Sequence, residues 1–145
     1  MAACLAAASI GTAEADDADA PISDPQKITT LMRGNTFHGV FIETGEPWVE
    51  FYCDSGRSLY DYKGRISLGK WWLDQSQICF SYDWSKYQHV QCFQMYAELD
   101  GSLDLIGIST YDGSLMTFHS APPEAGDPFK LEKRAAYGCQ LEPSV

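Results

Sequence analysis

The sequence is poor in positive charge. Its 145 residues include 10 Lys and Arg against 20 Asp and Glu, which gives a formal net charge of −10. Surfaces that bind nucleic acids or anionic membranes carry clusters of basic residues. The composition therefore argues against both kinds of partner and leaves a basic protein partner open.

Long hydrophobic runs and signature motifs are also missing. No apolar stretch approaches the roughly 18–20 residues that a membrane-spanning helix needs, so a transmembrane protein is not expected. The chain has no glycine-rich phosphate loop, no dinucleotide-binding fingerprint and no Gly-x-Ser-x-Gly nucleophile motif. We therefore expect no cofactor, and an enzyme has no support from any motif.

The first 15 residues are typical of an export signal. A short apolar stretch spans residues 5–10, and Ala13-Glu14-Ala15 is a cleavage pattern of the A-x-A type, although no basic segment precedes them. We predict a signal peptide at residues 1–15, a linker at 16–23, and a periplasmic or secreted protein. A lipoprotein anchored through Cys4 is the minor alternative, and an alanine-rich tail is another.

Cleavage after Ala15 would leave four cysteines, an even number that in an exported chain indicates two disulfides. A hairpin turn centred between Ser85 and Lys86 places Cys79 directly opposite Cys92. Opposed strand residues have Cα atoms about 4.5–5.5 Å apart, within the range that a disulfide spans. Cys53 then pairs with Cys139, because only these two remain. No Cys-x-x-Cys motif favours a metal instead.

A short helix is predicted to precede a long β region. Asp24 suits the helix N-cap, Pro25 the first helical position and Gly34 the stop. From Asn35, strand-like segments alternate with turn residues about every eight to twelve positions. Strands are expected at residues 36–42, 48–53, 57–62, 66–73, 77–82, 88–97, 102–109 and 114–119.

Every connection between these strands is too short for a crossover helix, so neighbouring strands must be antiparallel. The predicted fold is mostly β: an antiparallel meander of about eight short strands that closes into a small, disulfide-stapled barrel with a short N-terminal helix. The single domain is expected over residues 24–139, with a tail at 140–145. Residues 129–137 fit a short helix or an edge strand. Such a barrel is either filled with side chains or hollow.

The hairpin over residues 48–62 is assigned a two-residue turn at Ser55-Gly56. This register makes Trp48 and Glu50 part of an outer face and places Glu50 opposite Asp61. Glycoside hydrolases use such paired carboxyls, so a small hydrolase is an alternative function, although a solvated outer face is the simpler interpretation. The opposite face is expected to be core and carries Val49, Phe51, Cys53, Tyr60 and Tyr62.

Three histidines, His38, His89 and His119, fall on three different predicted strands. A catalytic zinc site needs three such ligands. A hydrolase that uses a histidine site is therefore a further form of the enzyme alternative. Their spacing forms no local motif, so no metal site is assigned.

Aromatic residues are the best functional lead. Trp71 and Trp72 are adjacent and must point to opposite faces of a regular strand. Trp84 and Tyr87 lie at a predicted hairpin tip, and Trp48 falls on the predicted outer face. Exposed Trp and Tyr are enriched where partners bind, so these five residues are the candidate binding residues, with simple packing as the alternative.

Two resemblances to known families can be stated. The short helix, the segment Gly34-Asn35-Thr36-Phe37-His38-Gly39 and the strands that follow resemble the lipocalin-like architecture over residues 24–119. Separately, the turn Phe51-Tyr52-Cys53-Asp54-Ser55-Gly56 is similar to that of the periplasmic C-type lysozyme inhibitors, which are small barrels. The first resemblance implies a ligand inside the barrel, and the second implies inhibition of an envelope enzyme.

The expected function is that of an exported, non-enzymatic binding protein. It would bind a small apolar ligand in the barrel, or a protein partner, such as a basic envelope enzyme, on its aromatic and acidic surface. A purely structural envelope protein is a further alternative, favoured if the barrel is filled.

Overall fold

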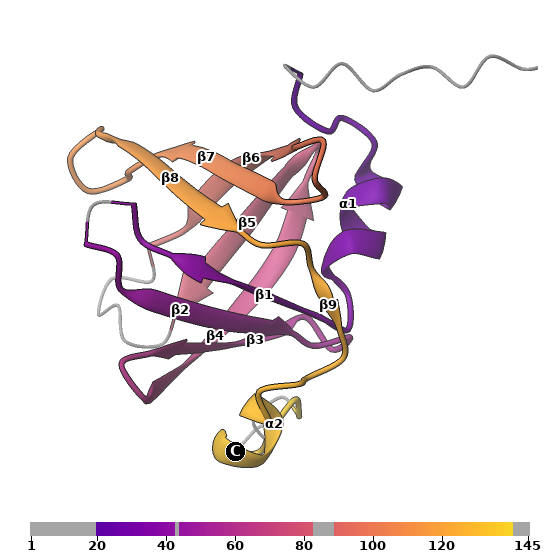
Figure 1. Ribbon diagram of the computed structural model, residues 1–145, viewed down its shortest axis with the longest axis vertical. Helices are drawn as coiled ribbons and strands as arrows, with labels where there is room; N and C mark the ends of the chain where they lie inside the picture. Colours follow the sequence, from indigo (N-terminus) through magenta and orange to yellow (C-terminus); the bar gives the residue numbers. More distant parts are fainter. Residues whose placement is uncertain (1–19, 43, 83–88, 141–145) are drawn as a thin grey trace, which may run out of the picture.

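The computed structural model describes residues 20–42, 44–82 and 89–140 (Figure 1). Several predictions lie outside the described residues. They concern the signal peptide, Cys4, the first half of the linker, the tip residues Trp84 and Tyr87, and residues 141–145.

Eight antiparallel strands form a closed barrel, as the sequence predicts. The strands follow one another in chain order from β2 to β8, and β1 closes the barrel by pairing with both β8 and β2. Their bounds are β1 (Asn35–Val40), β2 (Pro47–Tyr52), β3 (Arg57–Tyr62), β4 (Arg65–Asp74), β5 (Gln77–Tyr82), β6 (Gln91–Ala97), β7 (Leu103–Ile108) and β8 (Leu115–Ser120).

Helix α1 (Pro25–Met32) covers one end of the barrel (Figure 1). It begins as predicted, since the Asp24 side chain accepts a hydrogen bond from the backbone N–H of Gln26 at 2.9 Å. Ile28 and Met32 of α1 are fully buried and belong to the core that fills this end of the barrel. The helix therefore acts as a plug.

The segment after β8 runs back along the barrel. This segment contains Pro122, Pro123 and Pro128, as expected of a loop. Within it, a two-residue strand, β9 (Glu124–Ala125), pairs with the start of β1. The region expected to be either a helix or an edge strand contains α2 (Leu131–Arg134), a single helical turn. Neither α1 nor α2, the helices of the described residues, is long and apolar enough to cross a membrane.

Both predicted disulfides are confirmed. Cys79 and Cys92 lie directly opposite each other on β5 and β6, with Cα atoms 4.0 Å apart. Cys53 bonds Cys139 across a sequence separation of 86 residues. The second bridge holds the C-terminal segment against the outside of β2 and β3.

The predicted register of the β2–β3 hairpin is wrong by one residue. Tyr52 pairs with Ser58, and the N–H of Cys53 donates to the carbonyl oxygen of Arg57 at 2.8 Å. The loop therefore has three residues, 54–56, and not two. Its last residue, Gly56, has a φ of +88°, the left-handed conformation with which three-residue hairpin loops commonly end.

This one-residue shift exchanges the two faces of β2. Trp48, Glu50 and Tyr52 point into the barrel, whereas Val49, Phe51 and Cys53 point outward, opposite to the prediction. The outward face is apolar because it forms a second small core, in which the buried residues are Phe51, Cys53, Leu59 and Leu131 of α2. Both faces of the strand are buried, so hydrophobicity alone does not distinguish them.

Candidate functional site

The barrel contains a cavity of about 290 Å³. Its walls are mainly aromatic side chains from five strands: Trp48, Tyr60, Phe80, Tyr82, Phe93 and Phe118. Residues Ser109, Thr110 and Tyr111 of the β7–β8 loop line it at the end of the barrel opposite α1. The cavity is therefore plugged by the helix at one end and bordered by loops at the other.

The aromatic rings of the wall contact one another around the barrel. Ring centroids are 5.8 Å apart for Tyr60 and Tyr82, 6.2 Å for Tyr82 and Phe80, and 5.9 Å for Phe80 and Phe93. Phe118 continues the series, with its centroid 5.5 Å from that of Phe93. The barrel interior thus carries a nearly continuous aromatic lining.

Glu50 is the one carboxyl among the described residues that line this cavity, and no Lys or Arg is found among them. Its side chain comes from the middle of β2 and is buried, with 4% exposure. The phenol of Tyr52 donates a hydrogen bond to Oε2 at 3.0 Å, and that of Tyr82 donates to Oε1 at 2.7 Å. A single acidic group is therefore held in place in an aromatic environment.

Burial raises the pKa of Glu50 from its ordinary 4.5 to about 7, although the hydrogen bonds from Tyr82 and Tyr52 act in the opposite direction. The pKa values of the Tyr52 and Tyr82 phenols are raised well above their usual range, by burial and by the nearby Glu50. Both phenols therefore remain protonated donors near neutral pH. In contrast, Glu50 is present there in both its neutral and its charged form.

Trp48 lies inside the barrel and not on the outer face that the sequence predicts. It is buried and lines the cavity, and its indole Nε1–H has no hydrogen-bond acceptor within the described structure. The adjacent pair behaves as expected, since Trp71 is buried and Trp72 is 37% exposed. The Trp71 indole donates to the carbonyl oxygen of Cys53 at 3.1 Å. Of the three candidate aromatic residues that the structure describes, Trp48 is thus the one that lies in the cavity wall.

The predicted pairing of Glu50 with Asp61 is wrong. Glu50 lies opposite Tyr60, and Asp61 lies opposite Val49, so the two carboxyls are on opposite faces of the sheet. Asp61 accepts a hydrogen bond from Nη1 of Arg134 at 2.7 Å outside the barrel. The two carboxyls cannot act on one bond from opposite faces of the barrel wall.

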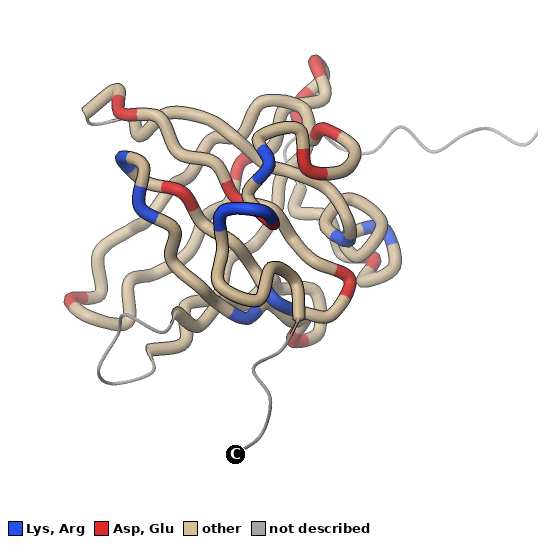
Figure 2. The backbone as a smooth tube through the Cα atoms, turned by 90° about the horizontal axis from the view of Figure 1, so that it is seen from below, with Lys and Arg blue, Asp and Glu red and all other residues tan. Residues whose placement is uncertain are grey.

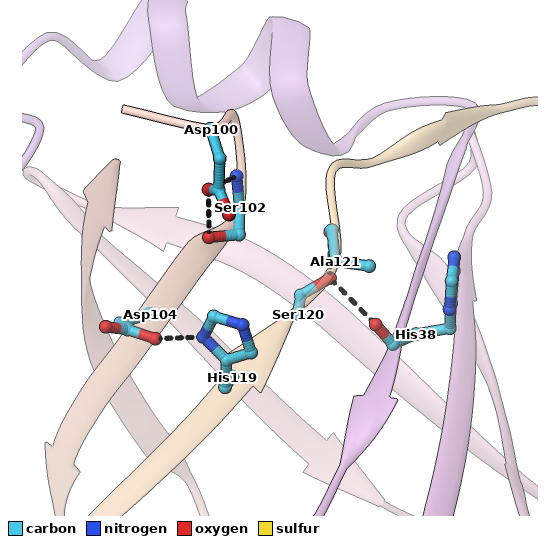
Figure 3. Close-up of polar contacts among 7 residues, drawn as sticks. All are labelled: His38, Asp100, Ser102, Asp104, His119, Ser120 and Ala121. Atoms are coloured by element: carbon cyan, nitrogen blue, oxygen red, sulfur yellow. Dashed lines mark hydrogen bonds and ion pairs between the residues drawn. The ribbon is translucent and has the colours of Figure 1, made fainter. Parts of the chain in front are cut away.

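The three histidines do not converge either. His119 contacts Asp104 on the neighbouring strand, with Nδ1 and Oδ1 2.6 Å apart, while Nε2 of His38 lies 3.5 Å from a carboxyl oxygen of Glu124. Figure 3 shows the His119 ring turned toward Asp104 and the His38 ring turned away from it. His89 lines the cavity, with its ring centroid 4.2 Å from that of Tyr111. No group of three metal-ligating side chains occurs within the described ranges.

Sequence reasoning missed the cluster of Glu50 with Tyr52, Tyr60 and Tyr82. A usable signal was present: Trp48-x-Glu50-x-Tyr52 places an acidic residue at the centre of an alternating aromatic series. A carboxyl flanked by aromatic residues on one face of a strand indicates a polar group in an otherwise apolar interior.

No protein-family model, curated protein or solved structure matches the chain. The site is therefore interpreted from its own geometry.

Proposed function

We propose that the protein is a non-enzymatic binding protein that takes a small, largely apolar ligand into its barrel. The observation that carries the proposal is the aromatic cavity of about 290 Å³ with Glu50 in its wall. Sites for small molecules are concave and mostly apolar, with a few polar groups that orient the ligand. The volume is near the lower end of the usual range of roughly 300–1,000 Å³, so a compact ligand is favoured.

Binding inside the barrel is better supported than binding of a protein on an aromatic surface. Trp48 and Trp71 are buried, so they offer no surface to a macromolecular partner. Of the proposed surface aromatics that the structure describes, Trp72 alone is exposed. The hollow interior also speaks against a purely structural barrel, whose inside would be filled with side chains.

We also propose that the protein works in an oxidising compartment, such as the periplasm or the outside of a cell. The support is the pair of disulfides, because such bonds persist in exported proteins and are rare in the cytosol.

Two neighbouring residues of β8 provide a matched test of the cavity. Met116 lines it, whereas Thr117 alternates to the outside of the barrel. Met116→Trp would place an indole where the ligand lies, while Thr117→Trp adds the same group outside. The probe is 2-phenylethanol, which is neutral and small, and the measurement is its dissociation constant from an NMR titration.

We expect Met116→Trp to weaken binding of 2-phenylethanol by roughly tenfold or more, because the larger side chain occupies the space in which the ligand would bury its apolar surface. Thr117→Trp should bind like the wild type. Equal binding by all three proteins, or no binding by any of them, would show that the cavity is not a ligand site.

A further inference from the structure

The Glu50 carboxyl has a charge and hydrogen-bond acceptor positions that a purely apolar ligand cannot satisfy. Taking an ionised carboxyl out of water is unfavourable unless an opposite charge or several hydrogen bonds compensate. The cavity wall offers no Lys or Arg within the described residues. Each carboxyl oxygen accepts one phenol hydrogen bond, although an ionised carboxylate has about four acceptor positions. The Ser58 hydroxyl is a third neighbour, whose hydrogen bonding also lowers the pKa of Glu50. Glu50 can therefore still accept a hydrogen bond from a ligand.

The rings around Glu50 also favour a positive charge. Tyr60 lies directly opposite Glu50 in the β2–β3 pairing, and the Tyr82 phenol contacts its carboxyl. The faces of aromatic rings attract cations at up to about 6 Å from the ring centroid, and the attraction grows when water is excluded. A carboxylate surrounded by aromatic rings is thus complementary to an ammonium group that is attached to an apolar body.

We infer that the cavity binds a small cationic amine, with its ammonium group on the Glu50 carboxylate and its apolar body against the aromatic wall. This inference rests on the proposed binding function and specifies the class of ligand. The net charge of −10 assists the approach of a cation, and Figure 2 shows acidic residues distributed widely along the chain.

Trp48 adds a second recognition element on the same strand. Its indole N–H is buried in the cavity wall without an acceptor in the described structure. A buried donor without a partner is unfavourable, so an oxygen on the ligand would stabilise the complex. An amine that also carries a hydroxyl or carbonyl oxygen is the best fit to both groups.

Three probes of similar size and different charge test the inference at pH 8. They are 2-phenylethylamine, which is cationic, 2-phenylethanol, which is neutral, and phenylacetate, which is anionic. We expect the amine to bind roughly tenfold more tightly than the alcohol, and the anion to bind most weakly.

Glu50→Gln removes the charge with little change in shape and should weaken binding of the amine by roughly tenfold to a hundredfold. The same variant should weaken binding of 2-phenylethanol by several-fold less than it weakens binding of the amine, because the alcohol carries no charge that pairs with the carboxylate. Asp61→Asn is the matched control, because it removes one carboxylate from the neighbouring strand on the outer face. It should bind the amine like the wild type.

The pH dependence supplies a second readout. 2-Phenylethylamine stays protonated between pH 5.5 and 8, whereas Glu50 ionises with a pKa of about 7. The affinity for the amine should therefore rise by up to roughly thirtyfold over this range. The other titratable groups in the cavity wall are the phenols of Tyr52, Tyr60, Tyr82 and Tyr111, together with His89. A rise that disappears in Glu50→Gln supports the inference, and a rise that persists in this variant contradicts it.

The outcomes separate this inference from the proposed function. If the alcohol binds in the cavity but the amine binds no more tightly, or Glu50→Gln does not weaken the amine, the inference is wrong and the binding function stands. If none of the three probes binds, both are wrong.

Discussion

At the scale of single residues, Glu50 distinguishes this barrel from one that is merely packed. It occupies an inward position between Trp48 and Tyr52 on β2, where an apolar side chain would stabilise the fold more simply. Ionisable groups with strongly shifted pKa values are common at functional sites because burial and specific partners shift them there. Glu50 is the residue on which the functional account depends.

The raised pKa of Glu50 makes folding stability depend on pH. The folded protein holds a proton between pH 4.5 and about 7 that the unfolded chain releases. The free energy of unfolding therefore falls as pH rises through this window and levels off above it. Relative to Glu50→Gln, the free energy of unfolding of the wild type should fall by roughly 2–3 kcal/mol between pH 5 and pH 8. Urea unfolding of both proteins at each pH measures the difference.

A second variant tests how the phenol hydrogen bonds change the pKa of Glu50. Tyr82→Phe removes a phenol hydrogen bond that lowers the pKa of Glu50, so the pKa should rise further. Carbon-13 NMR of the Glu50 carboxyl reports that pKa directly. An identical pH profile for the wild type and Glu50→Gln would mean that Glu50 does not ionise in a buried site.

At the scale of elements, the two hairpins show what sequence reasoning can and cannot determine. The register of β5 and β6 follows from the cysteines, because a disulfide between opposed strands permits few alignments. The β2–β3 hairpin has no such constraint. Its loop sequence fits two or three residues, and the choice depends on the left-handed conformation of Gly56.

The error in that hairpin also concealed the candidate site. The outer face of β2 carries Val49 and Phe51 because α2 and the Cys53–Cys139 bridge cover it. A strand that is buried on both sides loses the alternation from which its inner face is normally recognised. The strands, the helix and both disulfides were predicted. The inward position of Glu50 was missed, because the loop sequence left the register open and the alternating series Trp48-x-Glu50-x-Tyr52 was not given enough weight.

The two disulfides should differ in their contribution to stability. Cys53–Cys139 closes a separation of 86 residues and Cys79–Cys92 one of 13. In the chain-entropy treatment these loops correspond to about 4.5 and about 3 kcal/mol. Replacing Cys53 and Cys139 by Ala should thus lower the free energy of unfolding by roughly 1.5 kcal/mol more than replacing Cys79 and Cys92. Urea denaturation of the two double variants gives the comparison.

The loss of the longer bridge should also release α2 from the outer core around Leu131. Hydrogen exchange in α2 should therefore quicken in the first double variant and stay slow in the second. Equal destabilisation with no change in α2 would contradict the structural role given to Cys53–Cys139.

At the scale of the whole molecule, barrel closure and the α1 plug define the cavity. Closure depends on close contact between β1 and β8, where a Cβ added at Gly39 would lie 2.0 Å from the carbonyl oxygen of His119. Whether such a barrel is filled or hollow depends on how side chains from all eight strands pack together. Strand prediction contains no information on that packing, so the cavity emerges only from the assembled structure.

The indole N–H signals in a ¹H–¹⁵N correlation spectrum test the central claim most directly, that the barrel interior is the binding site. Trp48 lines the cavity, the Trp71 indole N–H is hydrogen-bonded to the carbonyl oxygen of Cys53, and Trp72 is exposed on the outside. During a titration with 2-phenylethanol, the Trp48 signal should shift in a saturable way while those of Trp71 and Trp72 stay in place. A shift at Trp72 with none at Trp48 would place binding on the outer surface and contradict the account.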